Sequence, residues 1–201
     1  MERFYSRQID EYRVIMVNSR NTECKMGTWN SQGKCEWTDR APRINCTDYP
    51  AICNDGTKWL LSIAGYNTTA ERHNIENNTW ESMPSLNVVR NAAAATVLNH
   101  VVYVFCGAGE SENLNSIERL AMEGANGREA YEEAWTLIEP SIDILSRRYY
   151  PAVIPINNTE IAILGGYEDD YLKDVILFNT EDDSVTKVCE DADGSYYPNS
   201  N

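Results

Sequence analysis

The stretch that decides the fold is VVYVFCG, residues 101–107, an apolar run of strand length that stops at a glycine. Two further runs have the same character: WLLSIAG at 59–65 and IAILGG at 161–166. Short runs that are rich in β-branched and aromatic residues and are cut by glycine predict strands buried on both faces, not amphipathic helices. Their recurrence at roughly 40 to 60 residues indicates a repeat architecture, in which each copy is one supersecondary unit.

Each buried run is expected to be the second of four strands in its copy. A turn signal separates it from an earlier strand-like segment: Asn54-Asp55-Gly56, Asn99-His100 or Asn157-Asn158. Asn, Asp and Gly accept the left-handed backbone that tight hairpins require. A segment of alternating polar and apolar residues, such as 116–120, follows as a third strand, and a polar turn leads to a fourth. Helical character is expected only at 128–135, for a turn or two inside a loop.

The two ends of the chain depart from this pattern. Residues 12–17 read as a second strand with no first strand before it, and 23–29 and 35–37 then read as a third and a fourth. At the other end, Tyr196-Tyr197-Pro198 resembles Tyr149-Tyr150-Pro151 and predicts the opening of a further first strand. The chain is therefore either cut from a longer protein or closed into a ring by that terminal strand.

The motifs at these positions resemble those of the kelch family of β-propellers. The family pattern has a Gly-Gly pair closing strand 2, a Glu-Arg/Val-Tyr unit in strand 3 and a Trp in strand 4. Glu71-Arg72-His73 followed by Trp80 fits this pattern with His73 in the Tyr place, and Gly165-Gly166 is the one intact glycine pair. Elsewhere the motifs are degraded, with these departures: Ala64-Gly65 and Cys106-Gly107 at the glycine pair, Leu120 and Phe178 in the Tyr place, Val185 in the Trp place, and Val17-Asn18 instead of glycines.

The resemblance covers nearly the whole chain. It implies an all-β fold, a kelch-type β-propeller of about four blades with four antiparallel strands each, either partial or closed by the C-terminal strand. It also implies a single domain, 1–201, with these segments: blades near 9–41, 42–84, 85–140 and 141–190, and a terminal strand stub at 191–201.

The glycines and tryptophans of the motifs have structural roles in this interpretation. Glycines are expected where strand ends approach other backbones too closely for a side chain: Gly65, Gly107, Gly165 and Gly166. Large aromatic rings are expected to fill the wedge between neighbouring blades: Trp37, Trp80 and Trp135.

The charge of the chain restricts its partners. Its 201 residues carry a formal net charge of −14, from 17 basic and 31 acidic residues. Such a surface repels nucleic-acid phosphate and anionic membranes and favours basic partners, so nucleic acid and membrane are not expected to bind. No apolar stretch is long enough to span a bilayer, and no apolar signal-peptide segment follows residues 1–7.

We expect a cytoplasmic location, with a secreted or surface location as the alternative. The six cysteines contain no Cys-x-x-Cys and are expected to be free, small buried hydrophobic side chains, which fits a cytoplasmic location. Four N-x-S/T sequons leave open a secreted or surface module whose cysteines pair: Asn45, Asn67, Asn77 and Asn157.

No metal, cofactor or small-molecule ligand is expected. The only histidines, His73 and His100, lie in a third strand and in a hairpin turn, and neither belongs to a cluster of metal-binding residues. The sequence has no G-x-S-x-G, no phosphate-cradling loop and no H-E-x-x-H. Residues 107–109 are glycine-rich, but they precede acidic residues that would repel phosphate.

The candidate site is an acidic rim. Two acidic segments follow the second strands of successive copies: Glu110 with Glu112, and Glu168, Asp169 and Asp170 with Tyr171 beside them. If the blades are equivalent, both loops lie on one face, and an acidic rim with an aromatic residue suits protein binding.

We therefore expect a non-catalytic protein–protein interaction module that binds a basic segment of another protein. Binding would use the loops 66–70, 108–115 and 167–173, together with the insertion at 121–134. The alternative is a small propeller enzyme that acts on a carbohydrate through loop carboxylates. That alternative requires a central pocket with two facing carboxylates and a nearby arginine.

Overall fold

In the computed structural model, the residues described are 4–10, 12–18, 21–56, 58–122 and 133–189. Within these ranges every regular element is a strand, and the strands form four antiparallel sheets of four. The all-β prediction is therefore confirmed. Each sheet contains four strands that are consecutive in the chain, and no sheet in the described part closes on itself.

The strands of the first two sheets have the following bounds: β1 (Phe4–Asp10), β2 (Arg13–Asn18), β3 (Cys24–Trp29), β4 (Cys35–Arg40), β5 (Ala51–Asn54), β6 (Trp59–Ile63), β7 (Ala70–Asn74) and β8 (Thr79–Met83). Those of the third and fourth sheets are: β9 (Ala94–Leu98), β10 (Val101–Ala108), β11 (Asn113–Ala121), β12 (Thr136–Ile138), β13 (Ala152–Pro155), β14 (Glu160–Tyr167), β15 (Tyr171–Asn179) and β16 (Val185–Cys189).

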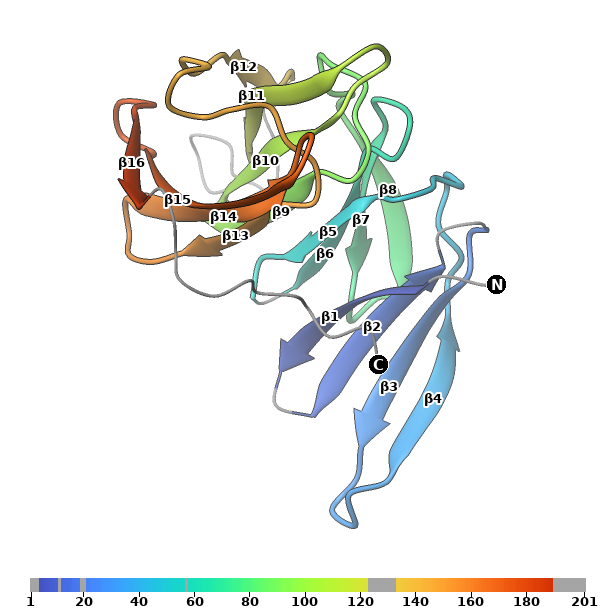
Figure 1. Cartoon of the computed structure of the whole chain (residues 1–201). Helices are drawn as coiled ribbons and strands as arrows, with labels where there is room; N and C mark the ends of the chain where they lie inside the picture. The colour runs from blue at the N-terminus through green and yellow to red at the C-terminus, as the bar shows by residue number, and fades with distance from the viewer. Residues whose placement is uncertain (1–3, 11, 19–20, 57, 123–132, 190–201) are drawn as a thin grey trace.

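The four sheets follow one another along an arc, with β1–β4 at one end and β13–β16 at the other (Figure 1). Their first strands are neighbours, because β1 contacts β5, β5 contacts β9, and β9 contacts β13. Backbone hydrogen bonds also join successive sheets just ahead of these strands. Ala92 N donates to Tyr49 O at 3.1 Å, and Tyr150 N donates to Ala92 O at 2.8 Å.

The sheet β1–β4 contains a first strand, β1, which the sequence analysis did not predict. β1 pairs with β2 over most of its length, from Phe4 opposite Asn18 to Asp10 opposite Arg13. The prediction that residues 12–17 lack a preceding first strand is therefore wrong. The predicted terminal strand at 191–201 and most of the predicted helical turn at 128–135 lie outside the described residues, and Glu133–Trp135 are not helical.

Two of the three predicted second strands, β6 and β10, are buried on both faces because each lies between two sheets, whereas β14 belongs to the last sheet of the arc and packs against the third sheet alone. On β10, Val102 and Val104 pack toward the second sheet, whereas Tyr103 and Phe105 pack toward the fourth. Ile163 on β14 belongs to the same cluster as Phe105. The hydrophobic core is therefore divided among the spaces between successive sheets. Because side chains alternate between the two faces of a strand, β10 contributes residues to two of these spaces.

The glycine pairs have one conformation in all three copies. The first residue of each pair has φ between 53° and 60°, whether it is Ala64, Cys106 or Gly165, and the glycine that follows has φ between 103° and 108°. A Cβ on Gly107 would lie 2.7 Å from the carbonyl oxygen of Asn91, and the space at Gly65 is equally restricted. The close approach of backbones predicted at these glycines is confirmed.

Two of the three predicted tryptophans link neighbouring sheets. The indole N–H of Trp80 donates to Ala41 O, and that of Trp135 donates to Pro84 O, both at 2.8 Å. The accepting carbonyls lie in the segments that lead into β5 and β9. Trp37 does not fill a wedge, because its side chain is 48% exposed at the end of the arc, where its ring covers Gly27.

Candidate functional site

The loops after the second strands and the segments that enter the first strands share one face. Because first and second strands pair antiparallel, the end of each second strand lies beside the start of its partner. Phe105 near the end of β10 is opposite Ala94, and Leu164 of β14 is opposite Ala152. We call this side of the molecule the entry face.

The acidic loop of the third sheet joins β10 to β11. Glu110 and Glu112 are both exposed there. Glu112 forms an ion pair with Arg147 at 3.1 Å, so part of its charge is offset by a cation on the segment that enters β13. The same loop borders a cavity of about 330 Å³ together with residues 87–89.

The acidic loop of the fourth sheet joins β14 to β15 and has a defined backbone. Tyr171 N donates to Asp170 Oδ1 at 2.7 Å, and the Tyr167 hydroxyl donates to Asp169 O at 3.2 Å. Asp169, Asp170 and Tyr171 are exposed, and Glu168 is half-buried. Both predicted acidic segments therefore lie in corresponding loops on the entry face.

A row of tyrosines crosses the same face. Neighbouring rings along it have centroid distances of 6.2, 6.1, 5.3, 5.4 and 5.2 Å, mostly in edge-to-face geometry, in the following order: Tyr66, Tyr49, Tyr150, Tyr149, Tyr167 and Tyr171. We call these six residues the tyrosine row. It starts in the second sheet, reaches the fourth and ends on either side of the acidic loop 168–170.

Sequence reasoning predicted only the last member of the row as part of a site. The available signal was the dipeptide Tyr-Pro, which precedes the first strand at both 49–50 and 150–151. The backbone at these positions is unusual, because Tyr49 and Tyr150 have φ of 56° and 52°. Such left-handed conformations are uncommon for bulky residues and persist where the surrounding structure imposes them.

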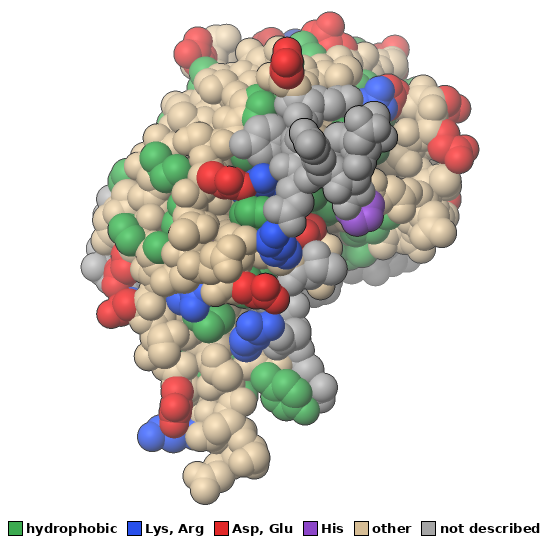
Figure 2. Space-filling model, turned by 180° about the vertical axis from the view of Figure 1, so that it is seen from behind, with side chains coloured by type: hydrophobic (Ala, Val, Ile, Leu, Met, Phe, Trp, Pro, Cys, Tyr) green, Lys and Arg blue, Asp and Glu red, His purple; other side chains and the backbone are tan. Residues whose placement is uncertain are grey.

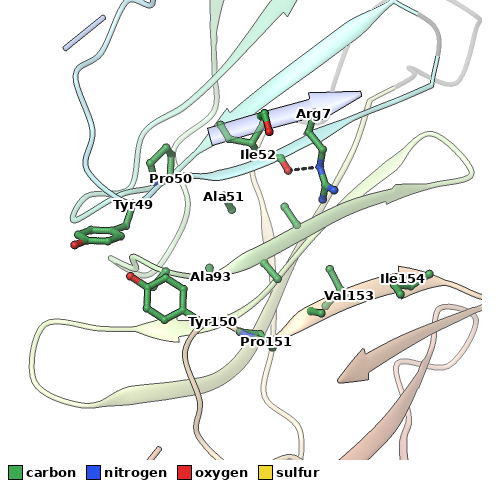
Figure 3. Close-up of a pocket in the computed structure, with 15 residues that line it drawn as sticks. Arg7, Tyr49, Pro50, Ala51, Ile52, Ala93, Tyr150, Pro151, Val153 and Ile154 are labelled. Carbon is green, nitrogen blue, oxygen red and sulfur yellow. Dashed lines mark hydrogen bonds between the residues drawn. The ribbon is translucent and has the colours of Figure 1, made fainter. Parts of the chain in front are cut away.

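The first strands and the segments that enter them line an open central cavity of about 370 Å³ (Figure 3). Tyr49 and Tyr150 approach one another at one end, and Arg7 lies at the other, where its Nε–H donates to Ile52 O at 2.9 Å. Alanine, proline, valine and isoleucine supply most of the remaining wall. No carboxylate is among the described residues that line this cavity.

Buried arginines hold the entry segments in place. Arg90 precedes β9 and pairs with Glu118 of β11 at 2.8 Å, with both side chains fully buried. Arg148 precedes β13 and donates to both oxygens of Asp174 of β15, at 2.6 and 2.8 Å. Arg43 of the second sheet has the corresponding partner, Glu71, at a longer 4.0 Å.

These arginines also bind backbone carbonyls, so they fix loops as well as carboxylates. Arg90 Nη1 donates to Cys106 O at 2.7 Å, and Arg148 Nη1 donates to Gly165 O at 2.9 Å. Burial lowers the pKa of Arg90, and the charge of Glu118 opposes that effect. Burial raises the pKa of Glu71. The backbone N–H donors of Asn45 and Ile44 and the charge of Arg43 lower it and so oppose the effect of burial.

The expectation that the cysteines are buried holds for Cys24, Cys53 and Cys106 but not for Cys46, which is exposed. The six cysteines are all unpaired, and burial raises the pKa of Cys24, Cys53 and Cys106 to about 12, which keeps these thiols protonated. His73 lies in the core position predicted for it, and His100 lies in the β9–β10 turn. In the parts of the chain that are described, no three His, Cys, Asp or Glu residues are grouped to hold a metal ion.

No protein-family model matches the chain, and no relative is found among curated proteins. No described segment forms a helix with the length and apolarity needed to cross a membrane. On the face opposite to that of Figure 1, acidic side chains are spread over the surface with basic ones beside them (Figure 2).

Proposed function

We propose that the chain is a partial or complete kelch-type β-propeller that acts as a non-catalytic protein-interaction module, with its entry face binding a basic segment of another protein. Four consecutive four-stranded sheets with adjacent first strands support the propeller interpretation. Glycine pairs of one conformation in three copies support the kelch resemblance.

The observation that carries the binding proposal is the exposed acidic loop 168–170 beside exposed tyrosines. Asp169 and Asp170 have no basic partner among the described residues, whereas Glu112 has Arg147. Tyrosine is enriched at protein interfaces, where it supplies contact area at low entropy cost. A negative loop beside such a patch steers positively charged partners toward it.

The carbohydrate-enzyme alternative has less support. It requires facing carboxylates in the central cavity, and the described lining supplies Arg7 without them. The acidic loops lie instead on the rim, where Asp169 and Asp170 are exposed to solvent. Protein binding is therefore the better-supported function.

The test combines three charge reversals in the acidic loop: Glu168→Lys, Asp169→Lys and Asp170→Lys. The probe is a fluorescein-labelled peptide of alternating glycine and lysine, with a glycine–glutamate peptide as its negative control. We expect the reversed variant to associate about tenfold or more slowly at low salt and to lose most of its salt dependence.

A matched variant controls for net charge. It carries Glu36→Lys, Glu76→Lys and Glu181→Lys, three exposed residues outside the entry-face loops, and thus the same overall change in charge. This variant should keep most of the wild-type association rate. Equal slowing in both variants, or no binding of the lysine peptide to the wild type, contradicts the proposed site.

A further inference from the structure

The tyrosine row can select among basic side chains on the entry face, whereas negative charge alone would attract all of them. Exposed members stand at both ends and near the middle, with exposed fractions of 62% for Tyr66, 53% for Tyr150 and 61% for Tyr171. Each ring is held by an aromatic neighbour at 5.2 to 6.2 Å, so the row is preorganised. Preorganised rings lose little entropy on binding.

Negative charge lies at the fourth-sheet end of the row. Glu168, Asp169 and Asp170 lie between Tyr167 and Tyr171. A cation placed on the rings of Tyr167 and Tyr171 would therefore meet carboxylates at this end of the row.

We propose that the tyrosine row binds an extended, arginine-containing segment of the partner, with guanidinium groups stacked on the rings and paired with the carboxylates of loop 168–170. This inference rests on the proposed function and specifies its partner.

Arginine fits this surface better than lysine for two physical reasons. The planar guanidinium stacks on aromatic faces and is weakly hydrated, whereas the ammonium group is a compact, strongly hydrated charge. The guanidinium fork also matches a carboxylate in bidentate geometry, so one side chain can contact a ring and an Asp together. Lysine would gain the charge attraction of the loop without most of the stacking.

An extended partner follows from the shape of the row. Its five ring-to-ring steps connect the second sheet to the fourth, passing the end of the central cavity that Tyr49 and Tyr150 line. A strand-like segment places alternate side chains on one face and can reach several rings in succession.

The experiment compares labelled glycine–arginine and glycine–lysine repeat peptides by fluorescence polarisation on the intact chain. The variants are Tyr150→Asn, which tolerates the left-handed backbone, Tyr171→Leu, and the two combined. Each lost ring should weaken binding of the arginine peptide about two- to fivefold, and the double variant roughly tenfold. Binding of the lysine peptide should change less, so the preference for arginine should largely disappear.

Two controls separate the ring from other effects. Tyr150→Phe and Tyr171→Phe keep the aromatic faces and should keep the arginine preference. Tyr12→Leu removes a tyrosine that is 57% exposed in the β1–β2 turn, away from the row, and should leave binding unchanged.

The outcomes distinguish this inference from the function on which it rests. Equal binding of both peptides, unaffected by ring loss but weakened by reversal of Glu168, Asp169 and Asp170, overturns the arginine inference and leaves the acidic site standing. Failure of both peptides to bind the wild type overturns the basic partner and this inference together.

Discussion

At the scale of single residues, Arg90 is the side chain whose loss the fold should tolerate least. Its partner Glu118 also accepts hydrogen bonds from the backbone of Asn87 and Val88, so Glu118 and Arg90 together fix the segment 87–90 that leads into β9. Arg90→Ala leaves a buried carboxylate without its cation and should reduce the free energy of unfolding by about 3–5 kcal/mol. Urea denaturation measures this change.

The matched comparison for Arg90 is Arg119→Ala. Arg119 pairs with Asp183 at 2.6 Å, but both side chains are about one-third exposed. Screening by solvent limits such a pair to about 0–1 kcal/mol. If both variants lose a similar free energy of unfolding, burial does not make the Arg90–Glu118 pair more stabilising than an exposed pair.

Burial of His73 should make the stability of the protein depend on pH. Burial lowers the pKa of His73. Its Nε2 lies 3.1 Å from Asn78 Oδ1, and its Nδ1 is buried without a hydrogen-bond partner in the described structure. Below about pH 6.5 the unfolded chain therefore binds a proton that the folded chain resists, so stability should fall as pH decreases from about 7.5 to about 5.5. His73→Gln should lose less stability over this interval in urea denaturation. A parallel loss in both proteins would count against the buried neutral histidine.

At the scale of the strand ends, the glycine pairs set the geometry of the entry face. Gly107→Ala must accept φ of 103° and a Cβ 2.7 Å from Asn91 O. We expect a loss of roughly 2–4 kcal/mol in the free energy of unfolding, from left-handed strain and the forced movement of backbone.

Gly33→Ala is the control for this position. Gly33 has φ of 74° in the β3–β4 turn, with open space around it. Its substitution should cost only the conformational part, about 1–2 kcal/mol. An equal or smaller loss at Gly107, measured by thermal and urea unfolding, would contradict the role assigned to close backbone approach.

The strands differ in how far their sequences predict them. β6 and β10 could be predicted because burial on both faces requires a dense apolar run. β1 could not, because FYSRQID mixes polar and apolar residues, and its pairing with β2 depends on a turn that carries no glycine signal. Trp37 was misassigned because the sequence cannot show that its sheet lies at the end of the arc.

The candidate site was predictable in part. The loops with Glu110 and Glu168 follow second strands directly, so their common face follows from antiparallel pairing. The tyrosine row was not predictable in full, because Tyr49 and Tyr66 flank the second sheet, Tyr150 precedes the fourth, and they meet only through tertiary packing. The left-handed backbone at Tyr49 and Tyr150 is likewise invisible in the sequence.

At the scale of the whole molecule, stability should be graded along the arc. β10 is buried along almost its entire length between two sheets, whereas β4 is exposed at an end of the arc. Amide hydrogens of β10 should therefore exchange with solvent at least about tenfold more slowly than those of β4. Native-state hydrogen exchange followed by mass spectrometry measures this ratio, and equal protection would indicate that the sheets open as one unit.

The order of the strands has a consequence for biosynthesis. Since β1 is the partner of β2, each of the four sheets, as far as the chain is described, consists of strands that are consecutive in the sequence. A nascent chain leaving the ribosome can complete the hydrogen bonding of one sheet before the next has been translated. Only the docking of one finished sheet against another must wait, so short-range pairing should precede the burial of the spaces between sheets.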